Sequence, residues 1–273
     1  AHTPTFPELC CHSSEDFEII DKREKIFFKT DEQSKKIQRE KIIPFWQERA
    51  LRGRILAMMS QEWKDCYSAG MFTEFMEQRG PGHTVADDKI YRKGFLDFKN
   101  EIKKSIELLD WENDFNALNK YDELTAMDIC CDAIITYARR YSALAKKKSE
   151  EEKDEKRKEE LQEISRICRK VPEYKPDTVH EALQMYWFVH IGVISEMNNW
   201  DSFNPGRLDQ HLFPFYSKQL MEGTIDREKA KELLECFWVK FNNQPAPPKV
   251  GVTLKESSTY TDFANINIGG LKS

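Results

Sequence analysis

The sequence predicts an α/β chain that is predominantly helical here, with a helical wrapper leading into a sheet or barrel. Apolar residues recur at helical spacing through most of the 273 residues. Alternating apolar residues, which are typical of strands, occur only near the end, at Val250 and Val252 and at Ile266 and Ile268. We therefore expect a helical region over about 1–243 and the first strands over about 244–273.

The N-terminal half is divided into helices by proline- and glycine-containing segments. Residues 1–16 look irregular, and Pro44 is expected to break the first helical run. A Gly-Pro-Gly turn around His83 separates the second run from the third. The helical segments expected in this half are 34–60, 62–78 and 89–109.

The middle of the chain predicts a helical hairpin. Residues 122–148 have apolar side chains at helical spacing, and 146–160 (KKKSEEEKDEKRKEE) form a charged, solvated end. A second arm returns through Leu161, Ile164 and Ile167 to Cys168. Thr178 and Glu181 then predict a capping box at the start of the next helix, in which each side chain satisfies an exposed N–H.

That next helix has an apolar stripe, which predicts that His190 is a core histidine rather than a ligand. The stripe consists of Leu183, Tyr186, Trp187, His190 and Ile194. Residues 206–216 predict a short helix ended by a proline. A helix over 227–243 follows a turn at Gly223 and an N-cap at Asp226. Its expected buried side is Ala230, Leu233, Leu234, Phe237, Trp238 and Phe241.

Composition excludes several classes of function. A net charge of -5 argues against nucleic acid as the main partner, because phosphate binding needs a basic face. No apolar run is long enough to span a bilayer, and no secretory signal opens the chain. The seven cysteines contain no CxxC pattern, so we expect no metal site and reduced thiols in the cytoplasm.

Polar loops between regular elements are the candidate sites. They are the His83 turn, Asn198–Phe203, Gly206–Asp209 and 257–263. His83 is either a loop hydrogen-bonding group or a functional acid or base. Arg207 and Asp209 are expected to anchor structure at a salt-bridged helix start. Phosphate-binding, zinc-protease and serine-hydrolase motifs are absent from the sequence.

Several longer blocks resemble a known family. They are FTEFMEQRGPGHTV, ALQMYWFVHIGV, NPGRLDQHLFPFY and ELLECFWVKFNNQPAPPKVGVTLKESSTYTDFANINIGG. Together they resemble the glycyl radical enzymes of the pyruvate formate-lyase-like superfamily, over essentially the whole chain. Within that superfamily, the sequence of these blocks most resembles the dehydratases that act on trans-4-hydroxy-L-proline.

The resemblance implies one pyruvate formate-lyase-like domain with a ten-stranded α/β barrel, of which residues 1–273 would be a part. It implies a glycyl radical, installed by a radical S-adenosylmethionine activating enzyme, and a thiyl radical that takes a hydrogen atom from the substrate. It also implies a homodimer, no tightly bound cofactor, and loss of water to give pyrroline-5-carboxylate. The Gly-Cys-Val-Glu and Arg-Val-x-Gly-Tyr loops of the family are absent, so this segment alone is expected to be inactive.

The resemblance also implies four substrate-binding residues. His83 would hydrogen-bond near the departing hydroxyl, and Asp201 would pair with the cationic ring nitrogen. Ser257 and Phe263 would line the pocket, although Ser257 could instead cap a turn and Phe263 could be core. Two alternatives stay open: a glycyl radical dehydratase for glycerol or propane-1,2-diol, and a non-catalytic helical binding module.

Overall fold

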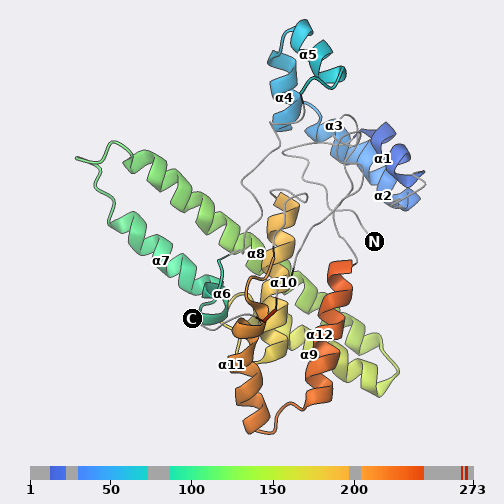
Figure 1. Ribbon diagram of the computed structural model, residues 1–273, viewed down its shortest axis with the longest axis vertical. Coiled ribbons are helices and arrows are strands. Elements are labelled where there is room, and N and C mark those ends of the chain that lie inside the picture. Colours follow the sequence, from blue (N-terminus) through green and yellow to red (C-terminus); the bar gives the residue numbers. More distant parts are fainter. Residues whose placement is uncertain are drawn as a thin grey trace. The chain divides into compact units, whose positions relative to one another are not determined.

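The computed structural model describes residues 13–22, 30–72, 86–196 and 204–242, together with Ile266, Ile268 and Gly269. Its chain divides into two units. The first contains Ala1–His83, Ile191–Asn204 and Trp238–Asn265, and the second contains Thr84–His190, Pro205–Phe237 and Ile266–Ser273. Every regular element longer than a single bridge is a helix in the part that is described (Figure 1).

Apart from the ends of two longer helices, short helices make up the described part of the first unit. They are α1 (Ser14–Asp21), α2 (Glu32–Ile37), the π-turn η1 (Gln38–Ile42), α3 (Ile43–Trp46), α4 (Leu51–Met58) and α5 (Gln61–Ser68). The predicted break at Pro44 is wrong, because the chain stays helical until Trp46. Pro44 lies in the first turn of α3, where its missing N–H is tolerated, and the π-turn lies immediately before it.

A buried lysine joins α1 to α2. The Nζ atom of Lys35 lies 2.7 Å from a carboxylate oxygen of Asp21 and 3.1 Å from one of Glu18. The Asp21 carboxylate also accepts the backbone N–H of Thr30 at 3.1 Å. Hydrogen bonding to Asp21 raises the pKa of Lys35 above its ordinary value, so this lysine stays charged although it is buried.

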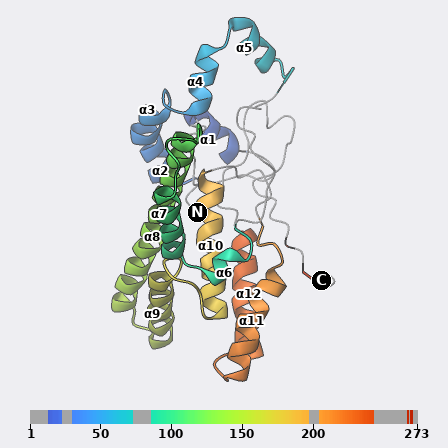
Figure 2. The ribbon, with the colours of Figure 1, turned by 90° about the vertical axis from the view of Figure 1, so that its left-hand side faces the viewer.

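The second unit contains longer helices. They are α6 (Lys89–Arg92), α7 (Phe95–Glu107), α8 (Ala117–Glu151), α9 (Glu155–Lys170) and α11 (Leu208–Met221), and α10 (Val179–Glu196) and α12 (Arg227–Asn242) begin in it. Both ribbon views show α7 running back along the first half of α8 and α9 along its second half (Figures 1 and 2). The predicted helix over 122–148 and the charged turn of a hairpin are therefore confirmed.

Specific contacts hold this three-helix arrangement together. Lys99 of α7 pairs with Asp128 at 2.7 Å and Asp132 at 2.9 Å on α8. Between α8 and α9, the hydroxyls of Ser142 and Ser165 each donate to the other residue's carbonyl, at 2.8 and 2.9 Å. Apolar packing adds a buried cluster of Ala138, Cys168 and Phe188, with Ile134, Tyr137 and Ile164 against it.

The predicted helix over 89–109 is wrong in one respect, because it is two helices separated at Lys93 and Gly94. Lys93 is extended, and the carboxylate of Asp97 accepts the N–H of Gly94 at 2.9 Å. The N–H of Phe95 donates to the carbonyl of Pro172 at 2.8 Å. The chain thus leaves its helical path to pair with a segment about eighty residues away, which local periodicity does not reveal.

Gly94→Ala is expected to destabilise the full-length protein strongly. A Cβ atom at Gly94 would lie 2.4 Å from the carbonyl oxygen of Glu173 and 2.5 Å from the Cα of Tyr174, so backbone has to move. We expect a cost of about 3 kcal/mol or more in the free energy of unfolding, measured by urea denaturation. The control is Gly223→Ala, where nothing lies within 4 Å and the φ of +69° costs about 1 kcal/mol. Equal losses for both variants would contradict this account of Gly94.

Three other predictions near the end of the chain need correction. The break at Pro214 is wrong, because α11 continues through this exposed proline to Met221. Ala230 and Phe237 of α12 are buried as predicted, whereas Leu234 and Trp238 are exposed in the described structure. Ile266 and Ile268 form no strand, and the rest of the predicted strand region over 244–273, apart from Gly269, lies outside the described residues.

Candidate functional site

The four substrate-binding residues that the sequence predicts are not among the described residues. They are His83, Asp201, Ser257 and Phe263. The structure does describe residues that follow three of their loops in the sequence: Ala86–Asp88, Asn204–Asp209, and Ile266, Ile268 and Gly269. Asp87, Asp209 and Gly269 from these segments come together with Tyr91 of α6 and His211 of α11 at the start of α11. We call these five residues the α11 anchor.

The start of α11 is fixed by its own sequence. Gly206 has a φ of 63°, a left-handed conformation that glycine adopts at little cost, and it turns the chain into the helix. Leu208 and Leu212 are buried one turn apart, so this face of α11 packs inward. Asp209 lies in the first turn, where a carboxylate interacts favourably with the helix dipole.

Asp209 ties the end of the chain to α11. One of its carboxylate oxygens accepts the backbone N–H of Gly269 at 3.1 Å, across sixty residues of sequence. Gly269 has a φ of +86°, a left-handed conformation that favours glycine at this position. The prediction that Asp209 is a structural anchor is confirmed by this bond. Arg207 is exposed at the N-cap position and forms no ion pair with Asp209 in the described structure, so the expected salt-bridged start is wrong in that detail.

His211 connects α11 to the residues that follow the His83 turn. Its Nε2 atom lies 3.1 Å from a carboxylate oxygen of Asp87. Its ring stacks on that of Tyr91, with centroids 5.1 Å apart and an interplanar angle of 25°. Tyr91 also packs near Phe215, one turn further along α11. Sequence spacing does not reveal this pair, because Asp87 and His211 are 124 residues apart.

The hydroxyl of Tyr91 is the buried polar group of this cluster. It has no hydrogen-bond partner, and the side chain is 6% exposed. Burial, together with the nearby Asp87 carboxylate, raises the pKa of this hydroxyl above its ordinary value. Tyr91 therefore stays protonated and neutral at physiological pH.

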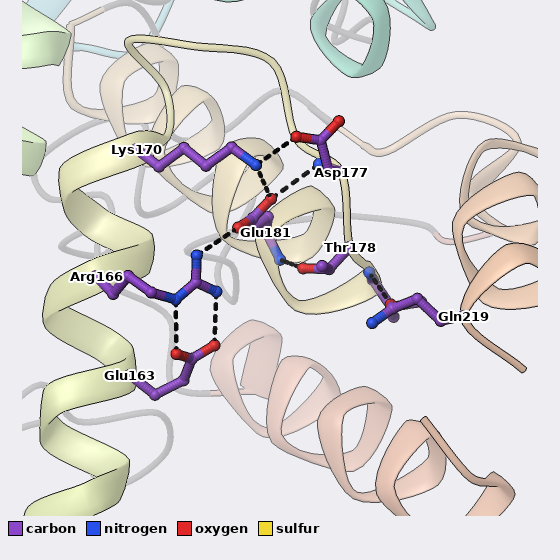
Figure 3. A network of polar contacts seen from close by, with 8 residues as sticks. Glu163, Arg166, Lys170, Asp177, Thr178, Glu181 and Gln219 are labelled. Atoms are coloured by element: carbon purple, nitrogen blue, oxygen red, sulfur yellow. Dashed lines mark hydrogen bonds and ion pairs between the residues drawn. The ribbon is translucent and has the colours of Figure 1, made fainter. Parts of the chain in front are cut away.

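A second polar network joins α9 to the start of α10 (Figure 3). The Glu181 carboxylate, 1% exposed, lies 2.6 Å from Lys170 Nζ and 2.9 Å from an Nη atom of Arg166. Arg166 also forms a bidentate pair with Glu163. The predicted capping box is half confirmed: Thr178 accepts the N–H of Glu181 at 3.2 Å, but Glu181 accepts that of Asp177, not that of Thr178.

This network also receives a contact from α11. The side-chain oxygen of Gln219 accepts the N–H of Val179 at 2.8 Å, which satisfies an N–H in the first turn of α10. Along α10, His190 is fully buried, and its Nδ1 atom lies 3.2 Å from the hydroxyl of Tyr186. The prediction that His190 is a core residue is therefore confirmed. These contacts make the Glu181 network a structural support of the α9–α10 junction.

Acidification is expected to weaken this junction in two stages. Burial lowers the pKa of His180 below its ordinary value of 6.5. The contribution of this histidine to folding stability is therefore present above pH 6.5 and is lost as pH falls from 6.5 through the folded-state pKa. Burial alone would raise the pKa of Glu181, but Lys170, the Asp177 N–H and Arg166 outweigh it and hold the pKa below 4.5. Its contribution is thus present above pH 4.5 and is lost as pH falls through the folded-state pKa.

Urea unfolding midpoints of the full-length protein at pH 7.5, 5.5 and 4 would measure both stages. The variant Glu181→Gln removes the carboxyl that titrates, so it should reduce the loss below pH 4.5 and leave the earlier loss in place. An unchanged pH profile in this variant would contradict the role given to Glu181.

The described residues offer little reactive chemistry of their own. Cys66, Cys130, Cys131, Cys168 and Cys236 are free thiols, whereas Cys10 and Cys11 lie outside the described ranges. Burial raises the pKa of Cys131 to about 11, so it is a poor nucleophile. Within the described ranges, His, Cys, Asp and Glu side chains form no group that could hold a metal ion. No helix in the described ranges is both long enough and apolar enough to cross a membrane.

Comparison with known proteins identifies the family of the chain and its relatives. The family described as pyruvate formate lyase-like matches residues 1–273. Trans-4-hydroxy-L-proline dehydratase of Clostridioides difficile is 58% identical over 268 residues, which are 98% of this chain and 34% of that protein. The chain thus spans about a third of the length of this relative.

Two solved structures match the chain as well. The crystal structure of hydroxyproline dehydratase from Clostridioides difficile with trans-4-hydroxy-L-proline bound has a TM-score of 0.87 and 57% identity, over 98% of this chain and 34% of that one. A structure concerning 1,2-propanediol dehydration in Roseburia inulinivorans has a TM-score of 0.77 and 29% identity, over 97% and 33%.

Proposed function

Because the chain belongs to the pyruvate formate lyase-like family, we propose that the full-length protein is a glycyl radical dehydratase that removes water from trans-4-hydroxy-L-proline. The observation that supports this most is the 58% identity, over 98% of the chain, to a dehydratase of that substrate. Residues 1–273 would be part of a single barrel domain, and the product would be pyrroline-5-carboxylate.

In this proposal the segment binds and orients the substrate. Asp201 pairs with the positively charged ring nitrogen, since a charge-assisted hydrogen bond suits a carboxylate and a secondary ammonium. His83 hydrogen-bonds the hydroxyl that departs, which needs a proton to leave as water. Ser257 contacts the substrate carboxylate, and Phe263 packs against the ring.

The radical chemistry would come from outside these residues. None of the seven cysteines lies in a Gly-Cys-Val-Glu context, and the Arg-Val-x-Gly-Tyr loop is absent from the sequence. A glycyl radical, installed by a radical S-adenosylmethionine activating enzyme, would supply the thiyl radical that takes the first hydrogen atom. We propose that no other cofactor is tightly bound, that the protein is a homodimer, and that it works in the cytoplasm.

A diol dehydratase is the second candidate, favoured by the propanediol-related structural match at 29% identity. A neutral diol gives Asp201 no charge to pair with, so the two candidates differ in substrate preference. Turnover of trans-4-hydroxy-L-proline, glycerol and propane-1,2-diol by the activated full-length protein tests the choice. We expect kcat/KM for hydroxyproline to exceed those for both diols by at least about 1,000-fold. A diol preference would overturn the proposal.

A further inference from the structure

We propose that the turn between α7 and α8 carries a surface through which two copies of the full-length protein associate. This surface is an exposed apolar patch, which we call the α7–α8 patch. Its members are Leu108, Trp111, Phe115, Leu118 and Tyr121. The inference rests on the homodimer of the proposed function and deepens it, but it does not depend on which substrate the enzyme dehydrates.

The α7–α8 patch contributes little to the core of its own unit. Phe115 is fully exposed, Leu108 is 84% exposed, and the other three members are also exposed in the described structure. Figure 1 shows the turn at the end of α8 that lies away from α9 and α11. The five residues together expose on the order of 600 Å², which is at the upper end of what a typical monomer exposes in one apolar patch. Patches of this size mark interaction surfaces.

Polar contacts within the turn keep the patch ordered. The Asp110 carboxylate accepts the backbone N–H and a side-chain N–H of Asn113, each at 3.0 Å. The Asp114 carboxylate accepts the N–H of Asn116 at 2.9 Å and lies 2.6 Å from the Nζ atom of Lys120. Because the turn is already ordered, little conformational entropy is lost when a partner binds to it.

The charges beside the patch favour a second copy as that partner. Lys103 and Lys104 lie about one turn before the patch on α7, and Asp122 and Glu123 border it on α8. All four are exposed, and none of them forms an ion pair within the described structure. Since the two helices of the hairpin run in opposite directions, the positive and negative pairs lie on opposite arms, at a similar distance from the turn.

A two-fold axis through the patch would use this arrangement. It would place the positive arm of each copy against the negative arm of the other, and the apolar patches against each other. Such an interface uses the same surface in both copies and closes as a dimer. The apolar patch and its charged borders together approach the about 800 Å² that each partner contributes to a standard interface.

Analytical ultracentrifugation of the full-length protein, over a range of concentrations, tests this interface. We expect Phe115→Glu to raise the dissociation constant of the dimer by at least about 100-fold, because the new charge is buried in both copies. The matched control is Met221→Glu, which places the same charge at an apolar residue that is 82% exposed at the end of α11. This control should leave the dissociation constant unchanged.

Charge reversal tests whether the partner is a second copy. Lys103→Glu with Lys104→Glu should raise the dissociation constant about tenfold or more, and Asp122→Lys with Glu123→Lys should do the same. A protein with all four changes should return to within about threefold of the wild type, because opposite charges again face each other across the two-fold axis.

A monomeric wild type, an unchanged dissociation constant in Phe115→Glu, or no recovery in the protein with four changes would overturn this interface. A lower urea midpoint of Phe115→Glu with an unchanged dissociation constant would show that the same chain covers the patch, which also overturns it. Hydroxyproline turnover is measured on the same activated wild-type samples. A wild type that dimerises through the patch, carries the radical and does not dehydrate hydroxyproline would overturn the proposed function alone.

Discussion

Asp201→Asn in the full-length enzyme is expected to lower kcat/KM for trans-4-hydroxy-L-proline by about 100-fold or more. Asparagine keeps the size and one acceptor oxygen of aspartate but loses the charge that, in the proposed function, would pair with the ring ammonium. Truncating one partner of a buried charged pair costs about 2–5 kcal/mol, and 100-fold corresponds to about 2.7 kcal/mol. Steady-state kinetics of the activated enzyme measure this loss directly.

The control for this variant is Asp226→Asn. Asp226 caps α12 by accepting the N–H of Lys229 at 2.7 Å, and asparagine caps helices about equally well. We expect wild-type kinetics for Asp226→Asn and equal glycyl radical content in both variants. Near-normal kinetics for Asp201→Asn would remove Asp201 from amine binding and would favour a neutral substrate.

Glu181→Ala should have the largest effect on stability among changes to polar side chains described here. It removes a buried carboxylate that receives bonds from Lys170, Arg166 and the Asp177 N–H. The two cations are partly exposed and can be hydrated, so the cost is below that of a fully buried pair. We expect a loss of about 2–4 kcal/mol in the free energy of unfolding, measured by urea denaturation.

Glu160→Ala is the matched control for Glu181→Ala. Glu160 pairs with Arg157 at 2.6 Å on the exposed side of α9, where ion pairs contribute about 0.5 kcal/mol or less. If Glu181→Ala were no more destabilising than Glu160→Ala, the network in Figure 3 would not support the α9–α10 junction.

Local patterns predicted the helices well where the cause was local. The hairpin of α8 and α9 follows from apolar spacing and a charged turn, and Asp226 was identified as a cap from its position alone. His190 was assigned to the core because it lies on the apolar stripe of α10. In each case neighbouring residues determine the outcome.

The sequence-based predictions were wrong where a contact with a residue distant in the sequence determines the local structure. The break at Gly94 exists because that glycine meets the backbone of Glu173 and Tyr174. The partners of Glu181 come from α9, and Asp87 bonds a histidine 124 residues further along the chain. Spacing alone predicts none of these contacts.

The candidate site was predictable to a different degree. His83, Asp201, Ser257 and Phe263 follow from family resemblance and stay predictions, since they lie outside the described residues. Asp209 was recognised as an anchor, whereas the role of His211 becomes visible only when α6 and α11 are seen together. The family resemblance thus suggests which residues touch the substrate. The structure shows the contacts of residues that follow them in the sequence, such as Asp87 and Gly269.

We propose that this segment supplies the substrate contacts of a hydroxyproline dehydratase. A crystal structure of the full-length protein with trans-4-hydroxy-L-proline bound tests it most directly. We expect the Asp201 carboxylate within about 3 Å of the ring nitrogen and the His83 imidazole at hydrogen-bond distance from the hydroxyl. A substrate bound by other residues, with Asp201 and His83 turned away from it, would contradict the proposed substrate contacts.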